Sequence, residues 1–349
     1  MRAERRSPSA PQTHKPIRAC AVSRADRTTV PVAPGRAPGT AYADTVTVTL
    51  ADPTGPRFHL SDGDARVEVT TVGAALRAFE VSGVDLVPRY ADTIATPAAS
   101  GVVLVPWPNR VAEGAWTQHG KSYQLAVSEP ATGAASHGLL RFTSYQPVSQ
   151  TSDAVTLTAD IVPQTGYPFH LRTTVTYALS GSALTVTHTI ENLGAEPAPV
   201  ALGTHPYLCI GGVDTADVTV QLDAPLRAVI DDRLIPIADD PVDEATDLRT
   251  PRRIGDLDLN TAYSGMPRDA EGRVRAVLAA PDGRTVELWA GPDFTRLQLF
   301  TTDRYPGQPV ALAIEPMTAP ANAFNSGEDL HWIEPGETWT LEWGITAAL

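Results

Sequence analysis

The sequence predicts an all-β protein, a large antiparallel β-sandwich. Many short runs alternate apolar and polar residues with a period of two, and turn residues separate neighbouring runs. No amphipathic helix of three turns is evident, and 31 prolines and 26 glycines in 349 residues disfavour long helices. Because the strand runs do not alternate with helices, we expect antiparallel pairing rather than a parallel sheet.

The alternating pattern begins at Thr45, where Val46, Val48 and Leu50 are separated by threonines. It continues at Val67 and Val69. The same pattern recurs at 155–158, 171–179, 184–190, 218–222, 274–278, 285–289, 297–301, 310–315 and 338–345. Antiparallel sheets often keep one face in water, and such a face forms a broad groove suited to a polar ligand such as a sugar.

The domain organisation follows from a change in composition near residue 43. Residues 1–42 are rich in Pro, Ala, Arg, Thr and Ser without periodicity, so we expect a disordered basic leader followed by one β-sandwich domain over residues 43–349. The leader has no apolar segment of the kind found in signal peptides, which predicts a cytoplasmic protein. No apolar run approaches 18 residues, so no membrane span is expected.

Charge and rare residue types exclude several classes of function. The chain has a formal charge of −13, and residues 43–349 hold 38 acidic against 19 basic residues, so nucleic acid and anionic membranes are poor partners. The two cysteines, Cys20 and Cys209, form no metal or redox motif. The two lysines, Lys15 and Lys121, lie in the leader and in a turn-like segment, which disfavours Schiff-base or P-loop chemistry. We expect no cofactor and no metal.

Two similar segments place an ionisable side chain directly before a proline. Glu315 precedes Pro316 at the end of an apolar run, and His205 precedes Pro206 in the same way. Proline biases the preceding residue toward extended geometry, so each side chain is expected to project from a stiff strand end. A carboxylate and an imidazole presented in this way suggest a general base and a general acid that share a ligand.

Two further polar clusters supply hydrogen-bonding groups. Asn109 and Arg110 offer amide and guanidinium donors for vicinal hydroxyls, and Trp107 offers a flat face for a sugar ring. Taken alone, this segment is also typical of a polar turn. His137 precedes Gly138 after a flexible stretch, although a lone loop histidine is more often structural.

Other ionisable residues receive simpler interpretations. His188 shares a strand face with Val186 and Ile190, which predicts a hydrogen-bonded core histidine. No two histidines have metal-ligand spacing. The acidic stretch from Asp231 to Asp247 lacks the spacing of a calcium loop and is expected to be a solvated connection.

Together these clusters resemble the aldose 1-epimerase (galactose mutarotase) family. The resemblance covers roughly residues 45–348 and rests on five segments in the family's order. These are Trp107-Pro108-Asn109-Arg110, Ser136-His137-Gly138, Thr204-His205-Pro206-Tyr207, Leu297-Gln298-Leu299-Phe300-Thr301 and Glu315-Pro316. It implies a β-supersandwich that interconverts the α and β anomers of free aldoses without a cofactor.

Carried over by motif, the resemblance implies His205 as the acid at the ring oxygen and Glu315 as the base at the anomeric hydroxyl. Arg110 and His137 would bind sugar hydroxyls, with Asn109 and Gln298 in support. Where the family often has an aspartate that binds hydroxyls, this chain has Asn260. Asp258, two residues earlier, is expected on the same side of the strand.

Two alternatives to a mutarotase remain at this point, and a glycoside hydrolase ranks below both. A sugar-phosphate 1-epimerase would need more arginines at the groove than Arg110, and Arg141 and Arg296 are the nearest candidates. A non-catalytic sugar-binding protein would have lost the acid or the base, whereas this chain has both. A glycoside hydrolase would need a second carboxylate placed like Glu315.

The expected partner is a monosaccharide, and the expected assembly is a monomer or a homodimer.

Overall fold

Antiparallel β-structure accounts for nearly all the regular structure of the computed structural model, which describes residues 52–349. The leader and the first alternating run (45–50) therefore lie outside the described residues. Every strand pairing in the described residues is antiparallel, which confirms the predicted fold class. The described helices comprise one short α-helix and four 3₁₀ turns, and none of them has the length or apolar character needed to cross a bilayer.

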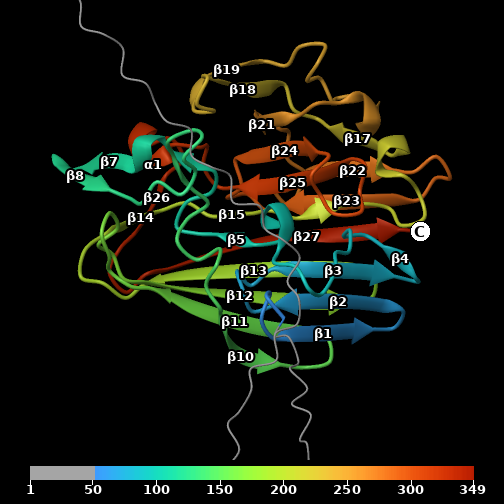
Figure 1. Ribbon diagram of the computed structural model, residues 1–349, viewed down its shortest axis with the longest axis horizontal. Coiled ribbons are helices and arrows are strands. Elements are labelled where there is room, and N and C mark those ends of the chain that lie inside the picture. The colour runs from blue at the N-terminus through green and yellow to red at the C-terminus, as the bar shows by residue number, and fades with distance from the viewer. Residues whose placement is uncertain (1–51) are drawn as a thin grey trace, which may run out of the picture. The chain divides into compact units, whose positions relative to one another are not determined.

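The larger of the two main sheets has nine strands (Figure 1). In spatial order these are β10 (Gln146–Gln150), β11 (Ala154–Ile161), β12 (Leu171–Ser180), β13 (Ala183–Asn192), β27 (Thr338–Ala348), β23 (Thr285–Ala290), β22 (Val274–Ala279), β17 (Thr219–Leu222) and β20 (Arg252–Arg253). Seven of the alternating runs predicted from the sequence fall in this sheet. In β12 and β13 buried and partly exposed residues alternate without interruption, as the period of two requires.

The second main sheet has eight strands and holds the motif segments. Its strands are β19 (Pro236–Pro241), β18 (Leu226–Ile230), β21 (Asn260–Ser264), β24 (Arg296–Thr302), β25 (Ala311–Met317), β15 (Gly203–Thr204) and β5 (Val103–Leu104), with β16 (Tyr207–Leu208) also paired to β25. The expectation that residues 231–247 form only a solvated connection is wrong in part. Asp239 and Asp240 belong to β19, which pairs with β18 as a hairpin.

Smaller elements complete the fold. Four strands form a separate sheet, β1 (Arg57–Asp62), β2 (Ala65–Thr70), β3 (Leu76–Val81) and β4 (Val84–Asp85). Three pairs are β14 (Ala198–Val200) with β26 (His331–Ile333), β6 (Arg110–Val111) with β9 (Ala135–Ser136), and β7 (Ala115–Gln118) with β8 (Lys121–Gln124). The helices are α1 (Ala323–Ser326), η1 (Pro97–Ala99), η2 (Ala112–Gly114), η3 (Thr215–Asp217) and η4 (Ile254–Asp256).

A single large core joins the sheets. Val175 and Trp343 of the nine-stranded sheet belong to the same buried cluster as Leu299 and Leu312 of the eight-stranded sheet, so their inner faces pack together as in a β-sandwich. The blue strands β1–β3 lie over the green strands β11–β13 in Figure 1, and β1 contacts both β11 and β12. The four-stranded sheet therefore packs on the nine-stranded sheet, which meets the motif-bearing strands through the shared core.

Candidate active site

Glu315 lies inside a central strand at a point where the pairing on one side is interrupted. Along β25, Leu312 and Ala313 pair with β16, and Met317 pairs with β15. Between them the facing segment is His205-Pro206, which belongs to neither strand, and the carbonyl of Pro206 accepts a hydrogen bond from the Ile314 amide at 3.1 Å. Proline lacks an N–H, so an interruption of the pairing is where Pro206 and Pro316 are tolerated.

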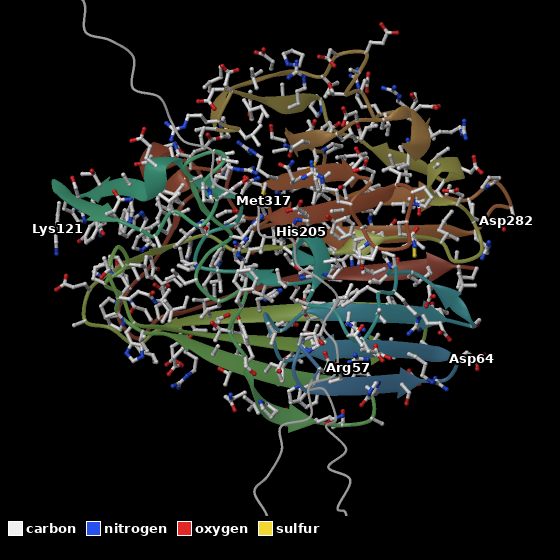
Figure 2. All side chains as sticks on the ribbon, viewed as in Figure 1. Arg57, Asp64, Lys121, His205, Asp282 and Met317 are labelled. Carbon is white, nitrogen blue, oxygen red and sulfur yellow. The ribbon has the colours of Figure 1, made fainter. Side chains whose placement is uncertain are left out.

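His205 is held opposite Glu315 by this interruption. Its amide donates to the carbonyl of Val102 at 3.2 Å, and its carbonyl accepts from the Gly101 amide at 2.8 Å. The Nε2 atom of His205 lies 3.4 Å from Oε1 of Glu315. The Tyr207 ring stacks against the His205 ring, with centroids 5.3 Å apart. Figure 2 shows His205 and Met317 near the middle of the molecule, over the β24–β25 region.

Burial shifts the pKa values of both members of this pair toward neutral forms. Glu315 is 2% exposed and His205 is 5% exposed. Burial raises the pKa of Glu315 to about 8, an effect that the positive charge of Arg110 opposes. Burial lowers the pKa of His205 to about 4. Both shifts favour a protonated carboxyl on Glu315 beside a neutral imidazole on His205.

Strand register brings Gln298 and Asn260 to the same face of the sheet as Glu315. Gln298 of β24 pairs with Glu315, and Ala262 of β21 pairs with Gln298. Residues directly opposite in an antiparallel pair share a face, as do residues two apart in a strand. Asn260, two residues before Ala262, therefore lies on this face, and its Oδ1 accepts a hydrogen bond from Gln298 Nε2 at 2.9 Å.

The short ladder between β6 and β9 joins the other two motifs. Arg110 pairs with Ser136, and the amide of His137 donates to the carbonyl of Asn109 at 2.8 Å. Asn109 and His137 both have positive φ, 54° and 61°, a backbone region that non-glycine residues seldom adopt. Such strain is often found at functional sites. The His137 ring lies edge-on to His205, with centroids 5.6 Å apart.

Neighbouring side chains hold three of the five N–H groups of the Arg110 guanidinium. Its Nε and Nη2 donate to the two carboxylate oxygens of Glu129 at 2.8 and 2.9 Å, and its Nη1 donates to Asn109 Oδ1 at 3.0 Å. Asn109, Arg110, Asn260 and Gln298 line one recess together, which is narrow, about 20 Å³. A sugar can enter only if side chains move, and the second N–H of Nη1 and of Nη2 can bind a hydroxyl while these three bonds persist.

Several buried polar atoms around the pair have no hydrogen-bond partner among the described residues. They are His137 Nδ1, His205 Nδ1, Glu315 Oε2 and Tyr207 OH. Buried polar atoms are nearly always partnered, and groups without a partner require an explanation. Four such atoms on residues in mutual contact are donors and acceptors available to a hydroxyl-rich ligand.

The structure thus brings together all seven residues singled out in the sequence: Asn109, Arg110, His137, His205, Asn260, Gln298 and Glu315. One secondary expectation is wrong. Trp107 is a core residue rather than a sugar platform, because its ring packs against Phe324 and its indole donates to the carbonyl of Ala135. Asp258 precedes β21 and is exposed like Asn260, whereas Leu257 and Leu259 are buried, which agrees with its expected place on the same side of the chain. It is not among the residues that line the recess.

Sequence reasoning missed Glu129 and gave Tyr207 no role. Glu129 directly precedes Pro130, just as Glu315 precedes Pro316. The position before a proline therefore marks Glu129 as well as Glu315. Glu196 and Glu334 also precede prolines but are exposed, so the signal is not specific. In residues 52–349, no three His, Cys, Asp or Glu side chains are grouped so that they could hold a metal ion.

Comparison with known proteins identifies the family of this chain. The aldose 1-epimerase family model matches residues 56–346. The Escherichia coli K12 protein YihR, which is uncharacterized, is 32% identical over 293 residues, 83% of this chain and 93% of YihR. Galactose mutarotase from Sus scrofa is 29% identical over 219 residues, which cover 57% of this chain and 62% of the pig protein.

Solved structures show the same fold. The GalM/aldose epimerase homologue from C. elegans superimposes with a TM-score of 0.74 at 18% identity, covering 84% of this chain and 98% of that one. Galactose 1-epimerase from Lactobacillus acidophilus NCFM gives a TM-score of 0.71 at 18% identity, covering 84% and 94%. With the family model spanning nearly all of the described residues, this chain belongs to the aldose 1-epimerase family.

Proposed function

We propose that this protein interconverts the α and β anomers of free aldoses by acid–base opening and reclosure of the hemiacetal ring. The contact between His205 and Glu315, 3.4 Å apart and almost completely buried, is the observation that carries the proposal. The anomeric oxygen and the ring oxygen are bonded to the same carbon. Two groups this close can therefore reach both oxygens at once, as ring opening requires.

In the proposed reaction Glu315 accepts the proton of the anomeric hydroxyl while His205 donates a proton to the ring oxygen. The bond between the anomeric carbon and the ring oxygen breaks, and an aldehyde forms. After rotation about the bond between the first two sugar carbons, the ring closes on the other face and both protons return. Nothing is oxidised or reduced.

The reactive form of the pair has a carboxylate beside an imidazolium. Burial favours the proton on Glu315, and transfer across the 3.4 Å contact moves it to Nε2 of His205. The positive charge of Arg110 favours that transfer, because it lowers the pKa of Glu315. General acid–base assistance of this kind contributes typically ~10²–10⁴-fold in rate.

Hydroxyl recognition is assigned to Asn109, Arg110, His137, Asn260 and Gln298. All of these residues except His137 line one recess. The ring of His137 lies next to that of His205, and its Nδ1 has no hydrogen-bond partner among the described residues. Arg110 is the one cation among the residues that line the recess, and Glu129 already neutralises it. Arg296 is engaged by carboxylates and Arg141 lines a different recess, so a phosphorylated sugar has less support than a neutral one.

Polarimetry tests the proposal. Freshly dissolved α-D-glucose or α-D-galactose should relax to its equilibrium rotation faster in the presence of the purified protein, and glucose 6-phosphate should not be preferred. Sugar affinity measured on the same sample separates an enzyme from a sugar-binding protein. Binding without any acceleration of the relaxation would overturn the proposed activity.

A further inference from the structure

Tyr207 lies next to the proposed catalytic pair on the same face of the sheet. It pairs with Ala313 of β25, and the Ile314 amide continues this ladder by donating to the carbonyl of Pro206 at 3.1 Å. The register therefore places Tyr207 diagonal to Glu315, because residues two apart in a strand share a face. Diagonal neighbours in an antiparallel pair lie roughly 7–8 Å apart, which is within reach of an aromatic side chain.

Two neighbouring rings fix the phenol ring of Tyr207. It stacks against the His205 ring, with centroids 5.3 Å apart and 20° between the planes. It also packs against the Tyr305 ring, with centroids 4.9 Å apart, and the Tyr305 hydroxyl is anchored because it donates to the carbonyl of Pro88 at 2.8 Å. Tyr207 is 0% exposed, so it lies deeper than the His205–Glu315 pair.

The hydroxyl of Tyr207 has no hydrogen-bond partner among the described residues. Other fully buried tyrosines have one, since the hydroxyls of Tyr167 and Tyr177 each donate to a backbone carbonyl at 2.7 Å. Tyr90 and Tyr145 also have unpaired hydroxyls, but neither belongs to a strand that pairs with β25. An unpaired buried hydroxyl beside an ionisable group points to a hydrogen bond that forms in another state of the site.

The carboxyl of Glu315 requires a donor in its ionised form. Its Oε2 atom has no partner among the described residues, and a buried charge is tolerated only when it is hydrogen-bonded. His205 contacts Oε1, and Gln298 uses one N–H to bind Asn260 Oδ1. Tyr207 offers a hydroxyl that no other group in the described residues engages.

The electrostatics around Glu315 favour a donor at Tyr207. Burial raises the pKa of Tyr207, and the negative charge of Glu315 raises it further, so the phenol stays protonated when Glu315 is ionised. A hydrogen bond from a neutral hydroxyl to a carboxylate is charge-assisted and favours the ionised form. The other titratable or charged groups near this carboxyl are His205 and Arg110, with His137 beside His205 and Tyr305 beside Tyr207, whereas Gln298 of β24 is neutral.

We propose that Tyr207 is a positioning residue that acts through Glu315: its hydroxyl donates a hydrogen bond to Oε2 when Glu315 is ionised. This bond stabilises the carboxylate beside an imidazolium, the form of the pair that accepts the proton of the anomeric hydroxyl. A carboxylate offers about four acceptor sites, so His205, Tyr207 and a sugar hydroxyl can be bound together. The inference rests on the proposed anomer interconversion and adds a third side chain to the proton-transfer pair.

Tyr207→Phe tests the proposal, because it removes only the unpaired hydroxyl and keeps the stacked ring. The alkaline fall of kcat/KM, where Glu315 loses its proton, should move to higher pH by about one unit, since the carboxylate loses a donor. We expect kcat to fall about tenfold, the equivalent of about 1.4 kcal/mol, with KM unchanged. Tyr305→Phe, in the same stack but bonded to Pro88, is the matched control, which should lower the free energy of unfolding and leave the alkaline fall in place.

The outcomes separate this inference from the proposed function. If sugars relax faster but the alkaline fall of Tyr207→Phe does not move, Tyr207 does not act through Glu315 and the mutarotase stands. A raised KM with an unmoved alkaline fall would assign the hydroxyl to the sugar and equally overturn the inference. If no sugar relaxes faster, infrared spectroscopy of the carboxyl band that Glu315→Gln removes decides. A pKa of Glu315 about one unit higher in Tyr207→Phe would support the inference, and an unchanged pKa would overturn it.

Discussion

Two buried histidines, His188 and His205, differ mainly in the group that each contacts. His188 lies in β13 of the nine-stranded sheet, and its Nε2 accepts a hydrogen bond from the indole of Trp343 at 3.0 Å. This confirms the prediction of a hydrogen-bonded core histidine. His205 faces the carboxyl of Glu315 at 3.4 Å instead. Both histidines are almost fully enclosed.

Burial alone does not distinguish the two residues. It lowers the pKa of His188 to about 3 and that of His205 to about 4. An indole only donates a hydrogen bond and does not exchange a proton near neutral pH, whereas a carboxyl group does. The side chain that contacts the imidazole, rather than the burial or the perturbed pKa of the histidine, therefore distinguishes a histidine that can transfer a proton.

The largest expected effect follows from removing either member of the His205–Glu315 pair. Glu315→Gln and His205→Asn should each lower kcat for mutarotation by roughly 10²–10⁴-fold, because each removes one proton-transfer group. The double variant should lose little more than the worse single variant, since the two act as a unit. Polarimetry measures the rates, and circular dichroism checks the fold. Independent, multiplicative losses would contradict a coupled pair.

The pH dependence of kcat/KM should be bell-shaped. Below about pH 4 His205 gains a proton while Glu315 is still protonated, so no base remains. Above about pH 8 Glu315 loses its proton while His205 is already neutral, so no acid remains. Activity should fall on both sides of this window. The residual activity of Glu315→Gln should no longer fall at alkaline pH. If kcat/KM of this variant still falls above about pH 8, a group other than Glu315 causes the fall.

His188 should affect stability and leave catalysis unchanged. His188→Leu removes the acceptor for the Trp343 indole and should lower the free energy of unfolding by about 1–3 kcal/mol, the cost of an unsatisfied buried donor. His188→Gln, which retains an acceptor, should lose less. Urea denaturation measures the free energy of unfolding of both variants, and kcat/KM is the second readout. A large fall in kcat/KM for a folded His188→Gln variant would contradict a purely structural role for His188.

The smallest effect is expected at Glu129, whose carboxylate neutralises Arg110. Glu129→Gln removes the counter-charge of Arg110 and leaves its guanidinium free to bind a sugar hydroxyl more strongly, so KM should fall by about two- to fivefold, the equivalent of below about 1 kcal/mol. With its counter-charge gone, Arg110 should also lower the pKa of Glu315 further, so the alkaline limb should move to lower pH. A raised KM would instead show that Glu129 positions Arg110. Glu113→Gln, at an exposed ion pair with Arg233, is the matched control.

The sequence by itself determined the secondary-structure type and the residue types on which the proposed chemistry depends. The period of two predicted β12 and β13 over nearly their whole length, because alternation is imposed by a sheet with one buried face. His205 and Glu315 were singled out by the proline that follows each of them, a local steric signal that Glu129, Glu196 and Glu334 share. The character of Asn109 and Arg110 as hydrogen-bond donors is likewise a property of the residue type.

The tertiary structure alone decided which of these groups meet. The register of β21, β24 and β25 puts Asn260, Gln298 and Glu315 on one face, and a shift by one residue would turn each of them to the other side. Packing placed Trp107 in the core and paired Glu129 with Arg110. His205 and Glu315 stand 110 positions apart in the chain. Local preferences carry no information about such contacts, which arise only when strand pairing closes the sheet.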